Sequence, residues 1–143
     1  MSQILFENCT LLDTVAAQLR PDHHVLVKGD RVVKVSHRPI AASDAVSIDV
    51  GGRTLMPGLI DAHAHATITT MSLEAMARKP VTLVMHEARP ILEDMLARGF
   101  TTIRDAGGAD YGLAEAVDRG LIRGPRIFYC GRPLSQTGGH GDQ

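Results

Sequence analysis

The sequence predicts an α/β protein in two parts, a small β segment over residues 1–56 and alternating strands and helices over residues 57–143. Short β-rich runs separated by turn residues fill the first part. After Pro57 the spacing of apolar residues alternates between strand-like and helical periods, which is typical of βαβ units with a parallel sheet. Apolar residues make up 44% of the chain and charged residues 22%, as expected for a globular protein.

Four short runs in the first part have strand character. They cover residues 4–6, 25–28, 31–35 and 46–50. Gly29 and Asp30 lie between two of these runs, and glycine at the first position of a two-residue loop favours a type II′ hairpin turn. His23, His24 and His37 lie in or beside the predicted turns. Because no carboxylate or other ligand stands at a useful spacing from them, we expect these three imidazoles to face solvent.

Strands alternate with helices after Pro57. The apolar run up to His65 predicts a strand that begins after this proline, because proline cannot donate a hydrogen bond to a sheet ladder. Helical spacing predicts helices over residues 86–98 and 112–119, each of which ends at the following glycine. A short additional helix is expected over residues 71–79.

Two histidines separated by one small residue end the first of these strands. Successive side chains of a strand point to opposite faces, so His63 and His65 share one face while Ala62 and Ala64 lie on the other. The two imidazoles therefore converge, as metal ligands do. Alternatively, each histidine is an ordinary surface or core residue. The position at the end of an apolar strand, where α/β barrels keep their chemistry, favours the metal site.

Other polar residues near the predicted strand ends are weaker candidates. The same alternation places Asp61 on the histidine face, one step deeper, where we expect a structural role. If Thr102 and Arg104 face it from the adjacent strand, Arg104 neutralises this carboxylate, as a buried charge requires. Asp105 and residues 107–108 end the second strand at the same side of the sheet, but aspartate followed by glycines is often only turn chemistry.

Three segments resemble the amidohydrolase superfamily. Residues 57–65 (Pro-Gly-Leu-Ile-Asp-Ala-His-Ala-His) are similar to its first barrel strand, and residues 99–108 (Gly-Phe-Thr-Thr-Ile-Arg-Asp-Ala-Gly-Gly) to its second strand and loop. Residues 124–142 resemble the third strand and loop of a narrower group, the prolidase-type Xaa-Pro dipeptidases and imidazolonepropionase-related enzymes. The resemblance implies a (β/α)8 TIM barrel that hydrolyses amides and esters with one or two divalent metals.

The resemblance also implies residues that the sequence does not contain. A complete barrel needs roughly 250 residues, and only three barrel strands can be placed in this chain. The family's carboxylated lysine, two later histidines and aspartate lie on subsequent strands. We therefore expect an incomplete N-terminal part of a TIM barrel, preceded by part of a composite β-sandwich, from a longer enzyme. The 143-residue chain by itself is expected to be inactive; a non-catalytic truncated fragment is one alternative.

The predicted activity is hydrolysis of an amide bond, in a dipeptide such as Xaa-Pro. A divalent metal lowers the pKa of bound water to about 7 and polarises the carbonyl. The imidazoles of His63 and His65 suit zinc, the expected metal, and also accept cobalt, manganese or nickel. The alternative substrate class is a cyclic amide, as in imidazolonepropionase-like hydrolases, because the first-strand motif does not distinguish linear from cyclic amides.

A glycine-rich loop near the end of the sequence is a second candidate site. Gly138, Gly139 and Gly141 surround His140 and allow the backbone to approach a ligand closely. We expect His140 to bind substrate. The alternative is an ordinary flexible turn. A phosphate-binding loop is not favoured, because the Lys and Ser/Thr signature of such loops does not follow.

Charge and hydropathy exclude several classes of partner. The net charge of −1 creates no strong field for nucleic acid or an anionic membrane. No apolar run approaches the roughly 20 residues of a membrane span, and the N-terminus lacks the features of a signal peptide. We expect a cytoplasmic enzyme that acts on small molecules or dipeptides, with no nucleic-acid or membrane partner. A homo-oligomer of the full-length enzyme is left open.

Overall fold

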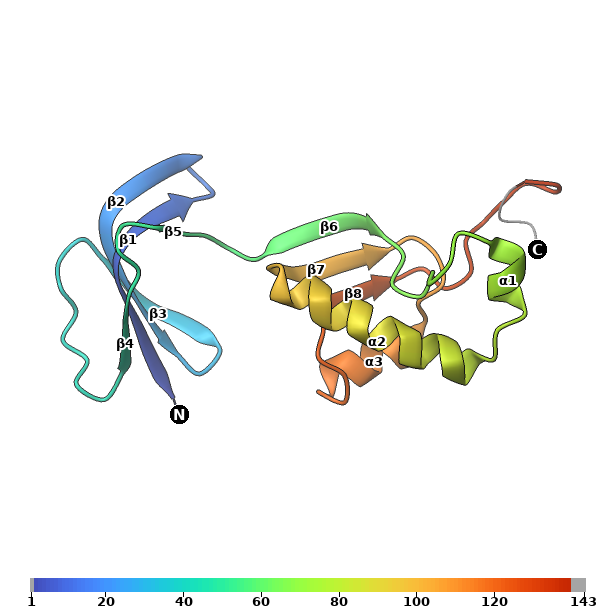
Figure 1. Ribbon diagram of the computed structural model, residues 1–143. Coiled ribbons are helices and arrows are strands. Elements are labelled where there is room, and N and C mark those ends of the chain that lie inside the picture. Colours follow the sequence, from blue (N-terminus) through green and yellow to red (C-terminus); the bar gives the residue numbers. More distant parts are fainter. Residues whose placement is uncertain (1, 140–143) are drawn as a thin grey trace. The chain divides into compact units, whose positions relative to one another are not determined.

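The structure is a computed structural model that describes residues 2–139, and it divides into two compact units, Met1–Pro57 and Gly58–Gln143. Each unit contains a sheet of its own (Figure 1). Pro57 belongs to the first unit, and the strand that carries the histidine pair begins two residues later, at Leu59. The chain is thus mixed α/β, with strands alone in the first unit and helices alternating with strands in the second.

The first unit is a five-stranded sheet with the order β3-β2-β1-β4, in which β5 also pairs with β1. Its strands are β1 (Gln3–Asp13), β2 (Gln18–Lys28), β3 (Arg31–Ser36), β4 (Val46–Asp49) and β5 (Thr54–Leu55). β1, β2 and β3 are antiparallel neighbours, whereas β4 and β5 run parallel to β1.

The hairpin between β2 and β3 has the predicted two-residue loop. Lys28 pairs with Arg31 across it, and Gly29 adopts the positive φ of 60° that the first position requires. β1 is much longer than the run at residues 4–6 that the pattern predicts. Its register with β2 shifts on both sides of Cys9. Such bulges interrupt the regular alternation on which a sequence-based prediction depends, although the strand itself continues.

The expectation that all three histidines of the first unit face solvent is wrong for His24. This residue lies on β2 opposite Ser36 of β3, and only 9% of it is exposed. Its Nδ1 is buried and has no hydrogen-bond partner within residues 2–139. Because β2 begins at Gln18, the strand includes positions that the sequence assigns to a turn.

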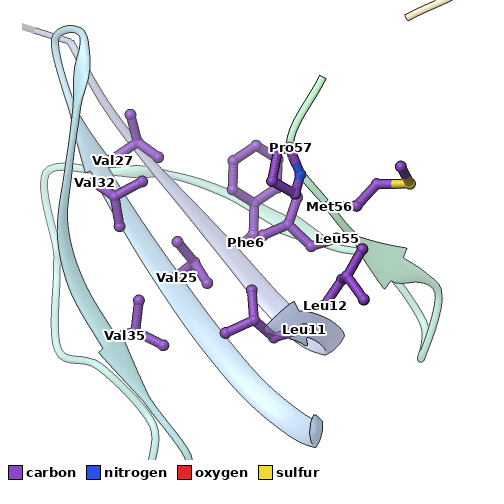
Figure 2. Close-up of a pocket in the computed structure, with 10 residues that line it drawn as sticks. All are labelled: Phe6, Leu11, Leu12, Val25, Val27, Val32, Val35, Leu55, Met56 and Pro57. Atoms are coloured by element: carbon purple, nitrogen blue, oxygen red, sulfur yellow. The ribbon is translucent and has the colours of Figure 1, made fainter. Parts of the chain in front are cut away.

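One face of the first unit forms an apolar hollow of about 240 Å³ (Figure 2). Valine side chains of β2 and β3 lie along one side of it, and Phe6, Leu55 and Pro57 lie along the other. Every residue that lines the hollow is apolar. It therefore offers no histidine or carboxylate for a hydrolytic metal and no charged side chain for a polar substrate, so the candidate chemistry lies in the second unit.

The second unit is a parallel three-stranded sheet with the order β6-β7-β8. Its strands are β6 (Leu59–Ala64), β7 (Phe100–Asp105) and β8 (Arg126–Tyr129), and its helices are α1 (Leu73–Ala77), α2 (Val81–Ala97) and α3 (Tyr111–Asp118). α2 contacts β7 and α3 contacts β8, as crossover helices of βαβ units do (Figure 1).

The core of the second unit lies between the helices and one face of this sheet. Leu92 of α2, Ile103 of β7 and Leu113 of α3 are at most 2% exposed. Ile127 of β8 belongs to the same cluster, whereas the next residue, Phe128, is 59% exposed. The sheet therefore has one face buried under helices and one open face.

The helices largely follow the predicted pattern. α3 lies within one residue of the prediction, and the Asp110 side chain caps it by accepting from the Leu113 N–H. α2 begins five residues before the predicted start, directly after Pro80, and continues through Pro90. That internal proline removes one helical hydrogen bond without ending the helix. Among residues 2–139, no helix combines the length and the apolar character that a membrane crossing needs.

Candidate metal centre

His63 and His65 lie side by side where β6 ends. Their ring centroids are 5.2 Å apart and their planes meet at 78°. Both residues are exposed, whereas Ala64 between them is 8% exposed and belongs to the core under the helices. The buried alanine and the exposed histidines therefore occupy opposite sides of the chain, as alternation along the strand predicts.

The ring of His65 is oriented by a backbone carbonyl. Its Nδ1 lies 3.1 Å from the carbonyl oxygen of Gly107, in the turn after β7. A carbonyl oxygen only accepts hydrogen bonds, so Nδ1 carries the proton and Nε2 keeps its lone pair. Metal-binding histidines are commonly held in this way, with one nitrogen donating to the protein and the other free for the metal.

The turn after β7 is organised by Asp105, which is completely buried. One carboxylate oxygen, Oδ1, accepts from the backbone N–H groups of Gly107 at 2.9 Å and Ala109 at 3.1 Å. The other, Oδ2, accepts from the N–H of Ala66 at 2.7 Å. Sequence reasoning treats Asp105 as a turn residue and misses its bond across to the strand of the histidines. An aspartate two residues before a glycine signals a local turn but not this long-range contact.

Backbone hydrogen bonds join the ends of the three strands. Ala106 donates to the carbonyl of Ala64 at 2.9 Å, and Gly108 donates to that of Gly131 at 3.0 Å. Gly108 has a φ of 113°, and a Cβ there would lie 2.1 Å from Oγ1 of Thr67. The loops after β6, β7 and β8 thus pack too closely for a side chain at this position, and they form one connected edge.

Asp61 and Arg104 do not form the predicted ion pair. Arg104 Nε donates to the carbonyl of Ala62 at 2.7 Å, and none of the ion pairs within residues 2–139 includes Asp61. Asp61 instead accepts from the backbone N–H of His63 at 3.0 Å. Asp61 pairs with Ile103 but Ala64 pairs with Asp105, so the register with β7 slips between them. The uninterrupted alternation that placed Asp61 beside the imidazoles is broken here.

The donors present fit part of a divalent metal site. Two adjacent imidazoles, one with its Nε2 left free, are ligands that zinc and related metals accept. Within residues 2–139 no group of three or more His, Cys, Asp and Glu side chains could hold a metal by itself. Since catalytic zinc sites usually have three protein ligands, His63 and His65 could supply two of them but not a complete site. His140, the predicted substrate-binding residue, lies outside the described residues.

A polar cluster ties the segment after β6 to helix α2. Glu87 accepts from Lys79 Nζ at 2.6 Å and from Thr69 Oγ1 at 2.5 Å, and Lys79 also donates to Thr69 at 2.9 Å. The hydrogen bond from Lys79, followed by that from Thr69, holds the pKa of Glu87 below its ordinary value of 4.5. The carboxylate therefore stabilises the fold in its charged form.

We expect Glu87→Gln to lower the free energy of unfolding at neutral pH, and this loss to shrink on acidification. Because the pKa of Glu87 is lower in the folded state, its contribution is present above the unfolded-state value and disappears as the pH falls through the folded-state value. Denaturant unfolding of both proteins across the acidic range measures this difference. Glu93→Gln, which breaks the more exposed Arg89–Glu93 pair of the same helix, serves as control and should cost less. A pH-independent difference for Glu87→Gln would contradict the assignment.

The chain is similar to proteins of known family and structure. Residues 54–143 match the model of the amidohydrolase family. A solved prolidase in complex with N-methylphosphonate-L-proline superposes with a TM-score of 0.92 and 46% identity, covering 99% of this chain and 35% of that one. A solved Xaa-Pro dipeptidase with methionine in its active site gives a TM-score of 0.82 and 28% identity, over 99% of this chain and 36% of that one.

A curated relative extends the comparison beyond the prolidases. Ochratoxinase of Aspergillus niger is 37% identical over 92 residues, which cover 62% of this chain and 19% of the relative. The chain therefore spans about a third of the solved structures and about a fifth of this relative. The resemblance predicted from the three sequence segments is confirmed by a family match over more than half of the sequence. The chain belongs to the amidohydrolase family.

Proposed function

We propose that this chain is the metal-binding N-terminal part of an amide hydrolase that cleaves dipeptides with a C-terminal proline. The observation that carries the proposal is the pair His63 and His65, with His65 Nδ1 held by Gly107. The likeness to a prolidase and an Xaa-Pro dipeptidase supports dipeptides over other amides. In this proposal the second unit supplies the first three strands of a TIM barrel, whose open face becomes the barrel interior.

The roles of this chain's residues follow from the contacts at the strand ends. His63 and His65 would hold a divalent metal, His65 through Nε2 because its Nδ1 donates to the Gly107 carbonyl. Such a metal supplies polarisation of the scissile carbonyl and activation of water at neutral pH. Metal binds the neutral imidazole, and in the neutral ring the carbonyl of Gly107 selects the form that carries its proton on Nδ1 and its lone pair on Nε2.

A substrate panel tests the proposal on the full-length gene product that contains this chain. We expect metal-dependent hydrolysis of Xaa-Pro dipeptides, loss of activity after chelation, and recovery when zinc is restored. Pro-Xaa dipeptides of the same composition are the matched control. Preferential cleavage of hydantoin or imidazolone rings would instead support the cyclic-amide alternative. A metal-loaded protein that hydrolyses neither class would refute the proposal.

We expect His140→Ala to weaken substrate turnover without removing metal. The sequence places His140 among glycines after the third barrel strand, where we propose that it donates a hydrogen bond to the carboxylate or scissile carbonyl of the substrate. Loss of such a charge-assisted bond costs roughly 1.5–3 kcal/mol, or about ten- to over a hundredfold in kcat/KM. Steady-state kinetics with elemental analysis measures both quantities. Loss of metal would make His140 a ligand, and unchanged kinetics would leave it a turn residue.

A further inference from the structure

Asp105 connects the two segments on either side of the His65 side chain. Its Oδ2 binds the N–H of Ala66, the residue directly after His65 in the chain. Its Oδ1 binds the N–H of Gly107, whose own carbonyl oxygen accepts from the His65 ring. The backbone of His65 and the group that orients its ring are therefore held by the same carboxylate.

We propose that Asp105 is a positioning residue that orients the ring of His65, selects the tautomer with its proton on Nδ1 over that with its proton on Nε2, and so presents Nε2 to a metal. The inference rests on the proposed function insofar as it assigns a metal to that nitrogen. Asp105 itself does not touch the metal or substrate in this proposal. It acts through the turn of residues 107–109, because its Oδ1 holds the N–H groups of Gly107 and Ala109, one on each side of the peptide that carries the Gly107 carbonyl.

The contacts of Asp105 need two acceptor atoms on one side chain. Three backbone N–H groups point at it, from Ala66, Gly107 and Ala109, and both of its oxygens are used. An asparagine has the same shape but only one acceptor atom, so its amide N–H2 group must face at least one backbone donor. Because the site is completely buried, water cannot easily replace the lost bond. Asp105→Asn should therefore loosen one of the two connections without creating a cavity.

Asp110 is a matched control for a purely structural role. It lies five residues further along the same loop and also binds a backbone N–H, that of Leu113 at the start of α3. Within residues 2–139 its side-chain hydrogen bond leads to α3 and not to the histidine pair. Asp110→Ala thus removes a carboxylate-to-backbone bond of the same kind, and it lowers stability by loss of a helix cap. It should leave the ring of His65 and the metal affinity unchanged.

The test combines two measurements on the full-length gene product, its Asp105→Asn and Asp110→Ala variants, and His65→Ala. Proton–nitrogen correlation spectra of the metal-free protein, at a pH above the ordinary histidine range, report which nitrogen of His65 carries the proton. Competition with a chromophoric chelator gives the zinc affinity. We expect the wild type to hold the proton on Nδ1, and Asp105→Asn to populate both forms and to bind zinc about 10- to 100-fold more weakly.

Each outcome decides a separate question. A folded Asp105→Asn protein with the wild-type proton position and zinc affinity overturns the inference, while His65→Ala still losing zinc leaves the proposed function intact. If neither wild type nor His65→Ala binds zinc, the proposed function fails, and the position of the His65 proton still decides the role of Asp105. Should Asp105→Asn not fold, Asp105→Ser is the second variant. If both unfold under conditions where Asp110→Ala is folded, Asp105 is a folding residue and the inference is overturned.

Discussion

Replacing His63 or His65 by alanine is expected to remove the bound metal from the full-length gene product and to lower amide hydrolysis by orders of magnitude. The two rings are neighbours, 5.2 Å apart between centroids, so each variant leaves a single imidazole at the strand end. A lone imidazole cannot maintain the ligand number of a hydrolytic metal site. Elemental analysis of the purified variants and their steady-state rates measure the two losses.

His86 supplies the matched histidine control for this experiment. It lies on α2 in the same unit, is exposed, and is not the partner in the ring contact that joins His63 and His65. His86→Ala should therefore keep its metal and its activity. Unchanged metal stoichiometry in both His63→Ala and His65→Ala would reject the assignment of the metal centre. Loss of metal in His86→Ala as well would show a non-specific effect of removing a histidine.

Truncation of Leu92 to alanine is expected to destabilise the second unit by about 2–5 kcal/mol. Leu92 is fully buried beneath the sheet in a cluster with Ile103 and Leu113. If Gly124 carried a Cβ, that atom would lie only 3.0 Å from the Cβ of Leu92. The backbone before β8 therefore packs directly against the Leu92 side chain. Alanine would leave a cavity, and the closely packed neighbours cannot move far enough to fill it. Denaturant unfolding, with the same slope m for both proteins, measures the loss in free energy of unfolding.

Leu83 on the same helix provides the corresponding control. It is 45% exposed, so Leu83→Ala creates no enclosed cavity and should cost about 1 kcal/mol or less. A loss for Leu92→Ala as small as that for Leu83→Ala would contradict the packing described here. Because Leu92 lies in the core under the helices while His63 and His65 are exposed, its variant should retain metal while it is folded.

The sequence predicts that His63 and His65 form a pair, but not the contacts that surround this pair. His63 and His65 could be paired from the alternation of a strand alone, because only two residue steps separate them. Asp61 lies only two further steps away, yet the prediction of its partner is wrong, because the register with β7 slips between Asp61 and Ala64. A slip of this kind depends on the neighbouring strand, and nothing in residues 59–65 alone signals it. The alternation of side chains therefore predicts the histidine pair of β6 correctly but fails for Asp61 in the same strand.

Local rules also account for much of the fold. The hairpin at Gly29 and the ends of α3 were predictable, because turns and helix caps depend on residues a few positions apart. The extent of β1, the start of α2 and the burial of His24 were not. Each of these features depends on bulges, on a proline that begins a helix, or on a strand partner distant in sequence.

By itself the sequence determined which strand ends in two imidazoles, where helices follow it, and that the segments resemble amidohydrolases. Only the tertiary structure decided how the His65 imidazole is held. The bonds from Asp105 to Ala66 and from His65 to Gly107 join residues 39 and 42 positions apart. Such contacts form only when β6 and β7 lie side by side in a parallel sheet, because this brings the ends of both strands, and the loops after them, to the same edge.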